Sequence, residues 1–505
     1  MDFNVDKQQL CACRIVREAK SEQGVDSDLT LPDYCPDIKS MLCCSIEPGI
    51  SSVNITGNRI TAEGNAVIRL LYVSADDKLA CHEQNYPLSK YVEMNSLNPD
   101  WQVTANAKVS YVNWRAVSPR RVDVHGCVSV LFSVMCCESK GFVSSVSGDS
   151  VRQKLVPFHG CSATGCVSKL FEMSEVIPLG GVESAVKGVI RSSAVPLINE
   201  VKAVNNKLLV KGEMQLCVSL CCENSSVKKV EHTMPISQII ELDGVDDTCI
   251  CDVKAAASSL DIRLKTDDNG EMQNLDAAVV IRADVCAYKP LNCACVEDVY
   301  SVKKELDIKT SPIESDRFAG MLDETFLVSF QPDFTGNEVG EVIDSWCESV
   351  TCVTTEKEGG TELSGTITLC VLYNGSEGNP VFTRRQNDYR FSKDLPNIRG
   401  NVNGNIAVQP CGTSVNGKGA TVNAKVQLRA RGCMFESENI MAVTNAEVLE
   451  NTEKSGSNYA VTVYFGENGE KLWDIAKKYN TSEETIRRRN NISGDVLEKE
   501  TMLII

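Results

Sequence analysis

The strongest constraint in this sequence is an internal repeat. The stretch Val53–Val73 (VNITGNRITAEGNAVIRLLYV) aligns without gaps with Val201–Cys221 (VKAVNNKLLVKGEMQLCVSLC). A third copy is Gly359–Asn379 (GGTELSGTITLCVLYNGSEGN). Because repeated segments fold alike, whatever one copy forms must occur three times in the chain.

Apolar and polar residues alternate within each copy. In the first copy the alternation runs from Arg59 to Leu70. A period of two is typical of a strand with one buried and one solvated face. A glycine stands in the middle of each pattern (Gly64, Gly212 and Gly365), which indicates a bulge or a close backbone approach rather than a ligand site. The sequence therefore predicts a mainly β fold built from three β-rich repeats.

The chain has 505 residues, more than one hydrophobic core accommodates. The repeats and the polar breaks between them divide it. We expect an N-terminal segment at 1–30 with a short helix over Lys7–Lys20, β-rich repeats at 31–145, 160–312 and 325–448, a linker at 449–458, and a small helical unit at 459–505.

Composition excludes several classes of function. The net charge of −17 argues against binding of nucleic acid or of an anionic membrane by the whole chain. No signal peptide is evident at the start, and no apolar run reaches the roughly 18 residues of a transmembrane helix. We therefore expect a chain without a transmembrane segment that is made in a reducing cytosol.

The 24 cysteines are numerous but carry no metal-binding spacing. No Cys-x-x-Cys pair occurs, and adjacent cysteines on a strand point to opposite faces. We interpret most cysteines as small core residues and expect neither a metal site nor a disulfide framework. The alternative is later oxidative cross-linking of exposed cysteines in an assembled structure.

Residues for catalysis are also lacking in the sequence. The histidines are His82, His125, His159 and His232, and none stands in a recognisable nucleophile motif. No glycine-rich phosphate loop ending in Lys-Ser or Lys-Thr occurs. We expect no enzymatic activity and no cofactor.

The repeats resemble the SPOCS domain of spore-forming Firmicutes. The first copy matches best, the second lacks the Pro-Asp opening, and the third keeps the glycine and a Leu-Tyr pair. The matching residues of the first copy are Pro36, Asp37, Ile38, Gly64, Leu71 and Tyr72. The resemblance implies an assembly role in the spore coat.

The C-terminal segment has helical periodicity instead. Leu472, Ile475, Ala476 and Tyr479 form one apolar helix face, and Thr481 with Glu484 predicts a capping box for a second helix. With a strand on each side, the order is β-α-α-β. This order and KLWDIAKKYNTSEETIRRRNNI resemble a LysM domain over 459–505, which implies a groove for N-acetylglucosamine chains of peptidoglycan or chitin.

The groove of a LysM domain lies between the loop before the first helix and the loop after the second. The resemblance places the partner- or glycan-binding groove at Gly469, Glu470, Lys471, Leu472, Trp473, Ile492, Ser493, Gly494, Asp495 and Leu497. A candidate basic patch is Arg487-Arg488-Arg489, for which a solvated helix face is the plainer interpretation.

Both groove loops depart from the sugar-binding pattern. Glu470-Lys471 stands where Asp-Thr is usual, and Glu498-Lys499-Glu500 stands where Pro-Gly-Gln is usual. Three SPOCS-like repeats with one LysM domain resemble the clostridial coat morphogenetic proteins that bind the SpoIVA coat-basement ATPase. This resemblance implies a scaffold in the mother-cell cytoplasm that assembles at the forespore surface with SpoIVA and other coat proteins. The alternative is a cell-wall tether that binds peptidoglycan or chitin oligomers.

Overall fold

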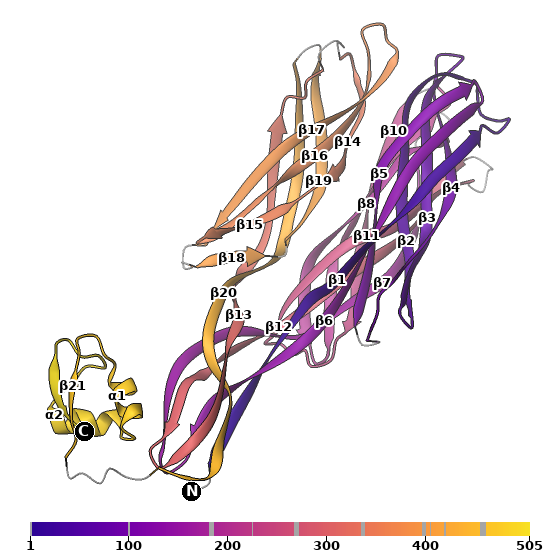
Figure 1. Ribbon diagram of the computed structural model, residues 1–505. Coiled ribbons are helices and arrows are strands. Elements are labelled where there is room, and N and C mark those ends of the chain that lie inside the picture. The colour runs from indigo at the N-terminus through magenta and orange to yellow at the C-terminus, as the bar shows by residue number, and fades with distance from the viewer. Residues whose placement is uncertain are drawn as a thin grey trace.

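A computed structural model describes residues 3–98, 101–180, 186–224, 226–266, 272–334, 339–395, 400–404, 406–418, 421–454 and 461–505. Most of the chain is antiparallel β-structure arranged in three units (Figure 1). Unit 1 contains β1 (Asn4–Thr30), β2 (Ile38–Thr56), β3 (Arg59–Ser74), β4 (Leu79–Glu93), β5 (Gln102–Ser118) and β6 (Arg121–Ser147). The prediction of a mainly β fold is confirmed.

Unit 2 repeats the strand order of unit 1, and unit 3 does so with two of the strands each divided in two. Unit 2 contains β7 (Val151–Pro178), β8 (Val186–Val204), β9 (Lys207–Cys222), β10 (Val227–Glu241), β11 (Ile250–Thr266) and β12 (Met272–Ser301). Unit 3 contains β13 (Lys304–Phe330), β14 (Val342–Val350), β15 (Val353–Glu358), β16 (Gly360–Asn374), β17 (Pro380–Asp394), β18 (Asn401–Gly404), β19 (Ala407–Lys418) and β20 (Thr421–Glu453).

Units 1 and 2 are each a sandwich of two three-stranded sheets. In unit 1 one sheet has the order β2-β3-β4, and the other is β1-β6-β5, so the first and last strands of the unit pair with each other. Unit 2 has the equivalent orders β8-β9-β10 and β7-β12-β11. In unit 3 the two halves are joined into one sheet because β15 pairs with β18. The faces between the sheets bury the apolar residues of the alternating pattern.

The mid-strand glycines lie opposite a bulge in units 1 and 2 and opposite the break between β14 and β15 in unit 3. The register of β2 shifts between Ile50 and Ser52, next to Gly64. A Cβ atom on Gly64 would lie 1.9 Å from the carbonyl oxygen of Gly49. The matching distances are 2.2 Å to Leu197 O for Gly212 and 1.9 Å to Thr351 O for Gly365. The expectation of a close backbone approach is confirmed, and no side chain fits at these positions.

The longest strands leave the sandwiches and pack together as a stem. The ribbons β1–β6, β7–β12 and β13–β20 converge at one end of the molecule (Figure 1). One buried layer takes two residues from each ribbon: Leu10 and Phe142, Phe158 and Cys295, and Ile313 and Ala442. A second layer does the same with Val143 and Val146, Val296 and Val299, and Val443 and Ala446. The stem therefore makes one body of three units.

The N-terminal segment is not helical. Residues Asn4–Thr30 form β1 and pair with β6 along its length, so the expected helix over Lys7–Lys20 is wrong. The segment shows no clear alternation of apolar and polar residues because most of its side chains are only partly buried in the stem. Unit 1 consequently begins one strand earlier than the repeat proposed at 31–145. Units 2 and 3 begin at Val151 and Lys304, ahead of the repeats proposed at 160–312 and 325–448.

The C-terminal unit has the order β21 (Val463–Gly466), α1 (Leu472–Lys478), α2 (Glu483–Asn490) and β22 (Thr501–Ile504). This confirms the predicted β-α-α-β arrangement. The N-cap of α2 is Ser482, whose hydroxyl accepts from the Thr485 amide at 3.1 Å, so the capping box assigned to Thr481 and Glu484 is wrong. In the linker predicted at 449–458, β20 extends to Glu453, and 455–460 lie outside the described residues.

Two disulfides join neighbouring strands, contrary to the expectation of none. Cys13 of β1 is bonded to Cys137 of β6, and Cys166 of β7 is bonded to Cys286 of β12. The two cysteines of each disulfide are 124 and 120 residues apart in the sequence, so the spacing of the cysteines does not predict the pairs. Within the described residues, no helix is long and apolar enough to cross a membrane.

Substitution of Gly64 by Ala should destabilise unit 1 strongly. The added Cβ would overlap the Gly49 carbonyl, and relief requires movement of the β2 bulge. Overpacking of this kind costs about 3 kcal/mol. Urea unfolding followed by circular dichroism measures the effect.

The matched control is Gly141→Ala in β6, where the nearest atom to a new Cβ is Gln8 O at 3.9 Å. This variant should unfold as the wild type does. Equal stability of the two variants would contradict the assignment of Gly64 to a bulge contact.

Candidate functional site

The LysM-like unit is held by a small apolar core under both helices. Leu472, Ile475 and Ala476 of α1 and Ile486 of α2 are buried together with Leu503 of β22. Their spacing places them on the inner faces of the helices, as the periodicity predicts. The core fixes the loops that precede α1 and follow α2.

The two loops of the predicted groove are joined by backbone hydrogen bonds. The Gly469 amide donates to Leu497 O at 2.7 Å, and the Leu497 amide donates to Glu470 O at 2.9 Å. The Leu472 amide donates to Asp495 O at 2.9 Å. The structure thus brings the predicted residues of the first loop next to those of the second.

The predicted groove residues differ in accessibility. Gly469, Lys471, Ser493, Gly494 and Asp495 are exposed. Leu472 and Leu497 lie in the core, and Ile492 is half-buried against it, so these three side chains support the loops from beneath. These three residues lie in or next to the groove loops, but their side chains do not line the groove.

A pocket of about 220 Å³ opens beside the joined loops. It is lined by Tyr464, Gly469, Glu470, Lys471, Asp474, Ile475 and Lys478. The Tyr464 hydroxyl donates to Glu470 Oε1 at 2.8 Å, and the Glu467 amide donates to Glu470 Oε2 at 3.0 Å. Both hydrogen bonds lower the pKa of the Glu470 carboxyl, and the bond from the Glu467 amide has the larger effect. The carboxyl is therefore ionised at neutral pH.

Trp473 faces the stem rather than the pocket. Its Nε1 donates to Asp298 Oδ2 at 2.8 Å, and Lys477 Nζ lies 2.7 Å from both Asp298 oxygens. The Tyr300 ring packs edge-on against the indole, with ring centroids 5.0 Å apart, and its hydroxyl donates to Thr481 O at 2.8 Å. Residues near the end of β12 therefore dock the LysM-like unit against the stem, which no local pattern in the sequence indicates.

The Arg487-Arg488-Arg489 run is not one basic patch. Arg487 forms ion pairs with Asp495 and Glu483, and Arg489 donates to the carbonyl of Ile505. Arg488 is exposed. Two of the three arginines thus brace the second loop and the C-terminal strand.

An exposed apolar face covers the outside of the β21–β22 sheet. Val463 pairs with Ile504 and Phe465 pairs with Met502, so the four side chains share one face. Their exposed fractions are 48%, 38%, 74% and 58% in that order. The alternation in VTVYF and TMLII carries this signal, but sequence analysis did not single the face out.

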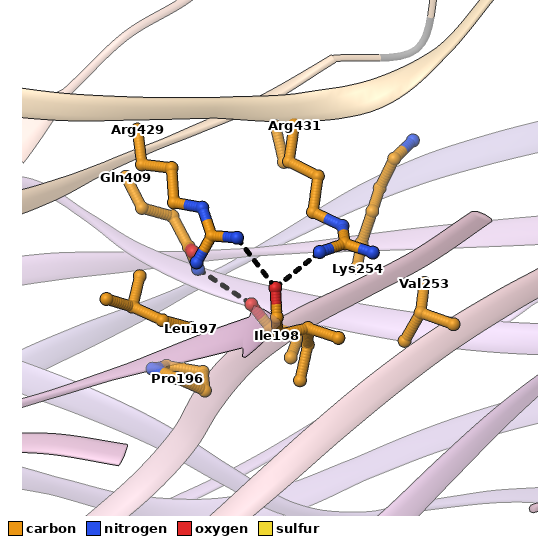
Figure 2. A pocket seen from close by; sticks show the side chains of 10 residues that line it. Pro196, Leu197, Ile198, Val253, Lys254, Gln409, Arg429 and Arg431 are labelled. Carbon is orange, nitrogen blue, oxygen red and sulfur yellow. Dashed lines mark hydrogen bonds between the residues drawn. The ribbon is translucent and has the colours of Figure 1, made fainter. Parts of the chain in front are cut away.

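A second cavity lies between units 2 and 3, and hydrogen-bonded side chains from unit 3 fill most of it. Arg429 and Arg431 both donate to the Ile198 carbonyl, and Gln409 Nε2 donates to Ala255 O at 2.7 Å (Figure 2). The cavity volume of about 20 Å³ is far below the roughly 300 Å³ of a small-molecule site. These arginines join the two units.

The histidines are dispersed. His125 Nδ1 lies 2.9 Å from Asp26 Oδ1 on the surface, whereas Cys127, two residues further on, is buried. His159 Nδ1 lies 2.9 Å from Asn292 Oδ1. The structure places neither histidine in a Cys/His pair.

Replacing Asp298 by Ala should release the LysM-like unit from the stem. The change removes the acceptor for the Trp473 indole and the partner of Lys477, while leaving the cores of both parts intact. We expect a larger radius of gyration in small-angle scattering and a changed Trp473 environment in fluorescence. The control is Asp307→Ala on the exposed side of β13, which should match the wild type; identical scattering of both variants would contradict the docking.

Comparison with known proteins identifies the domains. The family model described as "SipL, SPOCS domain" matches residues 37–117 and 185–265, and the LysM domain model matches residues 467–505. No curated protein and no solved structure gave a match. Unit 3 lies outside both SPOCS matches, although its strands follow the same order.

These domain types are non-catalytic, and they fit a spore coat-associated, peptidoglycan-binding protein. In its architecture of SPOCS domains followed by a C-terminal LysM domain, the chain resembles the SipL proteins.

Proposed function

We propose that the protein is a spore coat morphogenetic scaffold whose LysM domain docks onto a SpoIVA-like coat ATPase at the forespore surface. The observation that carries the proposal is the exposed apolar face formed by Val463, Phe465, Met502 and Ile504. Contiguous apolar side chains on a soluble domain mark a protein contact. A large aromatic at the centre of such a face is the usual anchor of a binding interface.

The pocket at the joined loops supports the same proposal. Its wall carries two carboxylates, Glu470 and Asp474, and two ammonium groups, Lys471 and Lys478. A glycan of N-acetylglucosamine is neutral and is held by stacking and by neutral hydrogen bonds. The only tryptophan of the domain is turned toward Asp298 on the stem. A charged surface of mixed sign suits a protein partner, where complementary charges set the orientation of docking.

The three β units provide the rest of the scaffold. Because the stem makes them one body, a partner bound at the LysM domain is held close to the end of the stem. Edge strands such as β4 and β10 offer backbone groups to which further coat proteins add strands. Assembly in the mother-cell cytoplasm at the forespore surface is part of this proposal.

A second candidate function is a cell-wall tether that binds peptidoglycan. The match to the LysM domain model and the pocket at its groove loops favour it. The two functions use different surfaces of one small domain. A variant on the outer sheet face therefore separates them.

Substitution of Phe465 by Ser should weaken binding to a purified SpoIVA-like ATPase at least tenfold. The side chain is exposed, so its loss removes about 1.4 kcal/mol or more of interface energy without opening the core. Biolayer interferometry with the full chain measures the affinity, and co-sedimentation with peptidoglycan is measured in parallel.

The control is Ile239→Ser on β10, an apolar side chain of similar exposure far from the LysM domain. It should bind as the wild type does. If Phe465→Ser keeps full affinity for the ATPase, the outer face is not the interface. If the wild type sediments with peptidoglycan and does not bind the ATPase, the protein is a cell-wall tether and not the proposed scaffold.

A further inference from the structure

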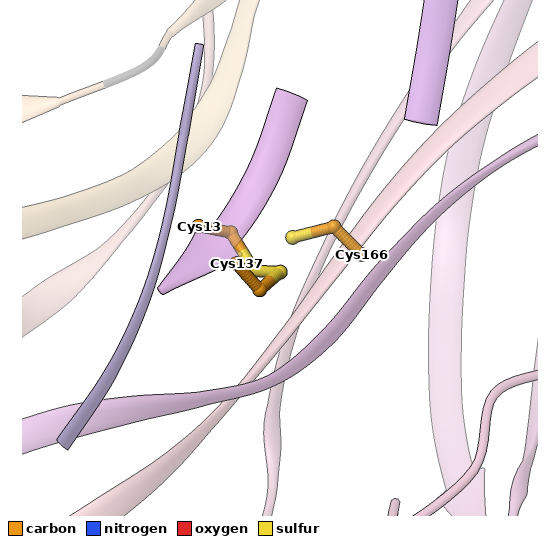
Figure 3. A group of neighbouring side chains, drawn as sticks. All are labelled: Cys13, Cys137 and Cys166. Carbon is orange, nitrogen blue, oxygen red and sulfur yellow. A yellow bond between two sulfur atoms is a disulfide. The ribbon is translucent and has the colours of Figure 1, made fainter. Parts of the chain in front are cut away.

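Four cysteines come together where units 1 and 2 meet. Cys13 of β1 lies opposite Cys137 of β6, and Cys166 of β7 lies opposite Cys286 of β12. The sulfur atoms of Cys13, Cys137 and Cys166 all lie within 4.8 Å of one another (Figure 3). Cys286 is bonded to Cys166, and its sulfur lies outside this group of three. Two cysteine pairs from different units therefore lie next to each other.

The backbone, rather than the sulfur bonds alone, holds the group in place. Side chains directly opposite each other in an antiparallel pair project from the same face of the sheet. Close to the cysteines, the Cys11 amide of β1 donates to Ser162 Oγ of β7 at 3.0 Å and joins the two units. Leu10 of β1 and Phe158 of β7 belong to one buried layer of the stem, which stabilises the same contact between the units. Strand pairing and the contact between the two units thus keep the four cysteines near one another.

The group has the accessibility that ion binding requires. Cys166 is buried, Cys13 and Cys286 are intermediate, and Cys137 is exposed. The inner sulfur is shielded from solvent, while the outer one leaves a path of entry. A structural disulfide pair needs no such opening.

Three clustered thiolates with a fourth on the paired strand match one class of ion. Tetrahedral Zn²⁺ with four cysteine ligands has Zn–S bonds of about 2.3 Å, which places the sulfurs roughly 3.8 Å apart. The sulfurs of Cys13, Cys137 and Cys166 already lie within 4.8 Å of one another, and side-chain rotation of Cys286 brings in the fourth. In the reducing cytosol where the proposed function places the chain, cysteine clusters are more often metal sites than disulfides. No metal site is evident in the sequence because these ligands come from four separate strands and share no local spacing.

We propose that, when its thiols are reduced, this cluster binds one Zn²⁺ through Cys13, Cys137, Cys166 and Cys286 and so ties unit 1 to unit 2. The disulfide and metal forms exclude each other, because each sulfur forms one or the other bond. Reduction of each disulfide by a phosphine and water takes up two electrons and two protons and yields two thiols and a phosphine oxide. Zn²⁺ binding then releases the four thiol protons.

Cobalt substitution tests the site. The full chain is reduced with a phosphine under anaerobic conditions, desalted and titrated with Co²⁺. We expect one equivalent to give the visible ligand-field bands and the near-ultraviolet charge-transfer band of tetrahedral cobalt thiolate, and one equivalent of Zn²⁺ to abolish them. Cys166→Ser and Cys137→Ser should each weaken Zn²⁺ binding at least 100-fold. The control is Cys411→Ser, a half-buried cysteine outside the cluster, which should bind as the wild type does.

Alkylation mapping of the wild type provides a second readout that does not depend on the folding of a variant. With Zn²⁺ present, the four cysteines should be protected together, and with a chelator they should react. Absence of a thiolate spectrum in the reduced wild type would overturn the proposal. So would a spectrum that survives in both variants, or Zn²⁺ protection of cysteines outside the cluster.

Discussion

The convergence of three two-stranded ribbons into one stem is the contact on which the rest of the structure depends. Each ribbon alone presents an apolar face that it cannot cover, and each buried layer is complete only when all three contribute. A layer such as Phe142 with Phe158 and Ile313 is formed by residues from distant parts of the sequence. The repeats therefore stabilise one another, and removal of one unit would expose the stem residues of the other two.

The stem also sets the position of the LysM domain. Asp298 and Tyr300 lie near the end of β12, where the stem finishes, and they take up the indole of Trp473 and the ammonium group of Lys477. With this helix face directed at the stem, the opposite sheet face with Phe465 is turned to solvent. The fold thus distinguishes an inner, docked side of the small domain from an outer, available side. The proposed interface lies on the available side.

The sequence was informative wherever a pattern is local. Alternation and the mid-strand glycines predicted the hairpins, because a bulge leaves no space for a Cβ at Gly64. Helical periodicity around Leu472 predicted α1 in the same way. Long-range features could not be predicted from one sequence. The pairing of β1 with β6, the meeting of Cys13 with Cys166 and the contact of Trp473 with Asp298 join residues whose neighbourhood is set by the stem. The helix proposed at the N-terminus failed for this reason, since a half-covered stem strand shows no clean alternation.

Hydrogen exchange of the full chain, with and without a purified SpoIVA-like ATPase, tests the central claim most directly. The account predicts that the partner slows exchange in Val463–Gly466 and Thr501–Ile504 while the stem layers are unchanged. Protection confined to the joined loops at 469–472 and 493–497 in the presence of peptidoglycan fragments, with no effect of the ATPase, would contradict it. In that case the LysM domain would act as a glycan-binding module on a β scaffold.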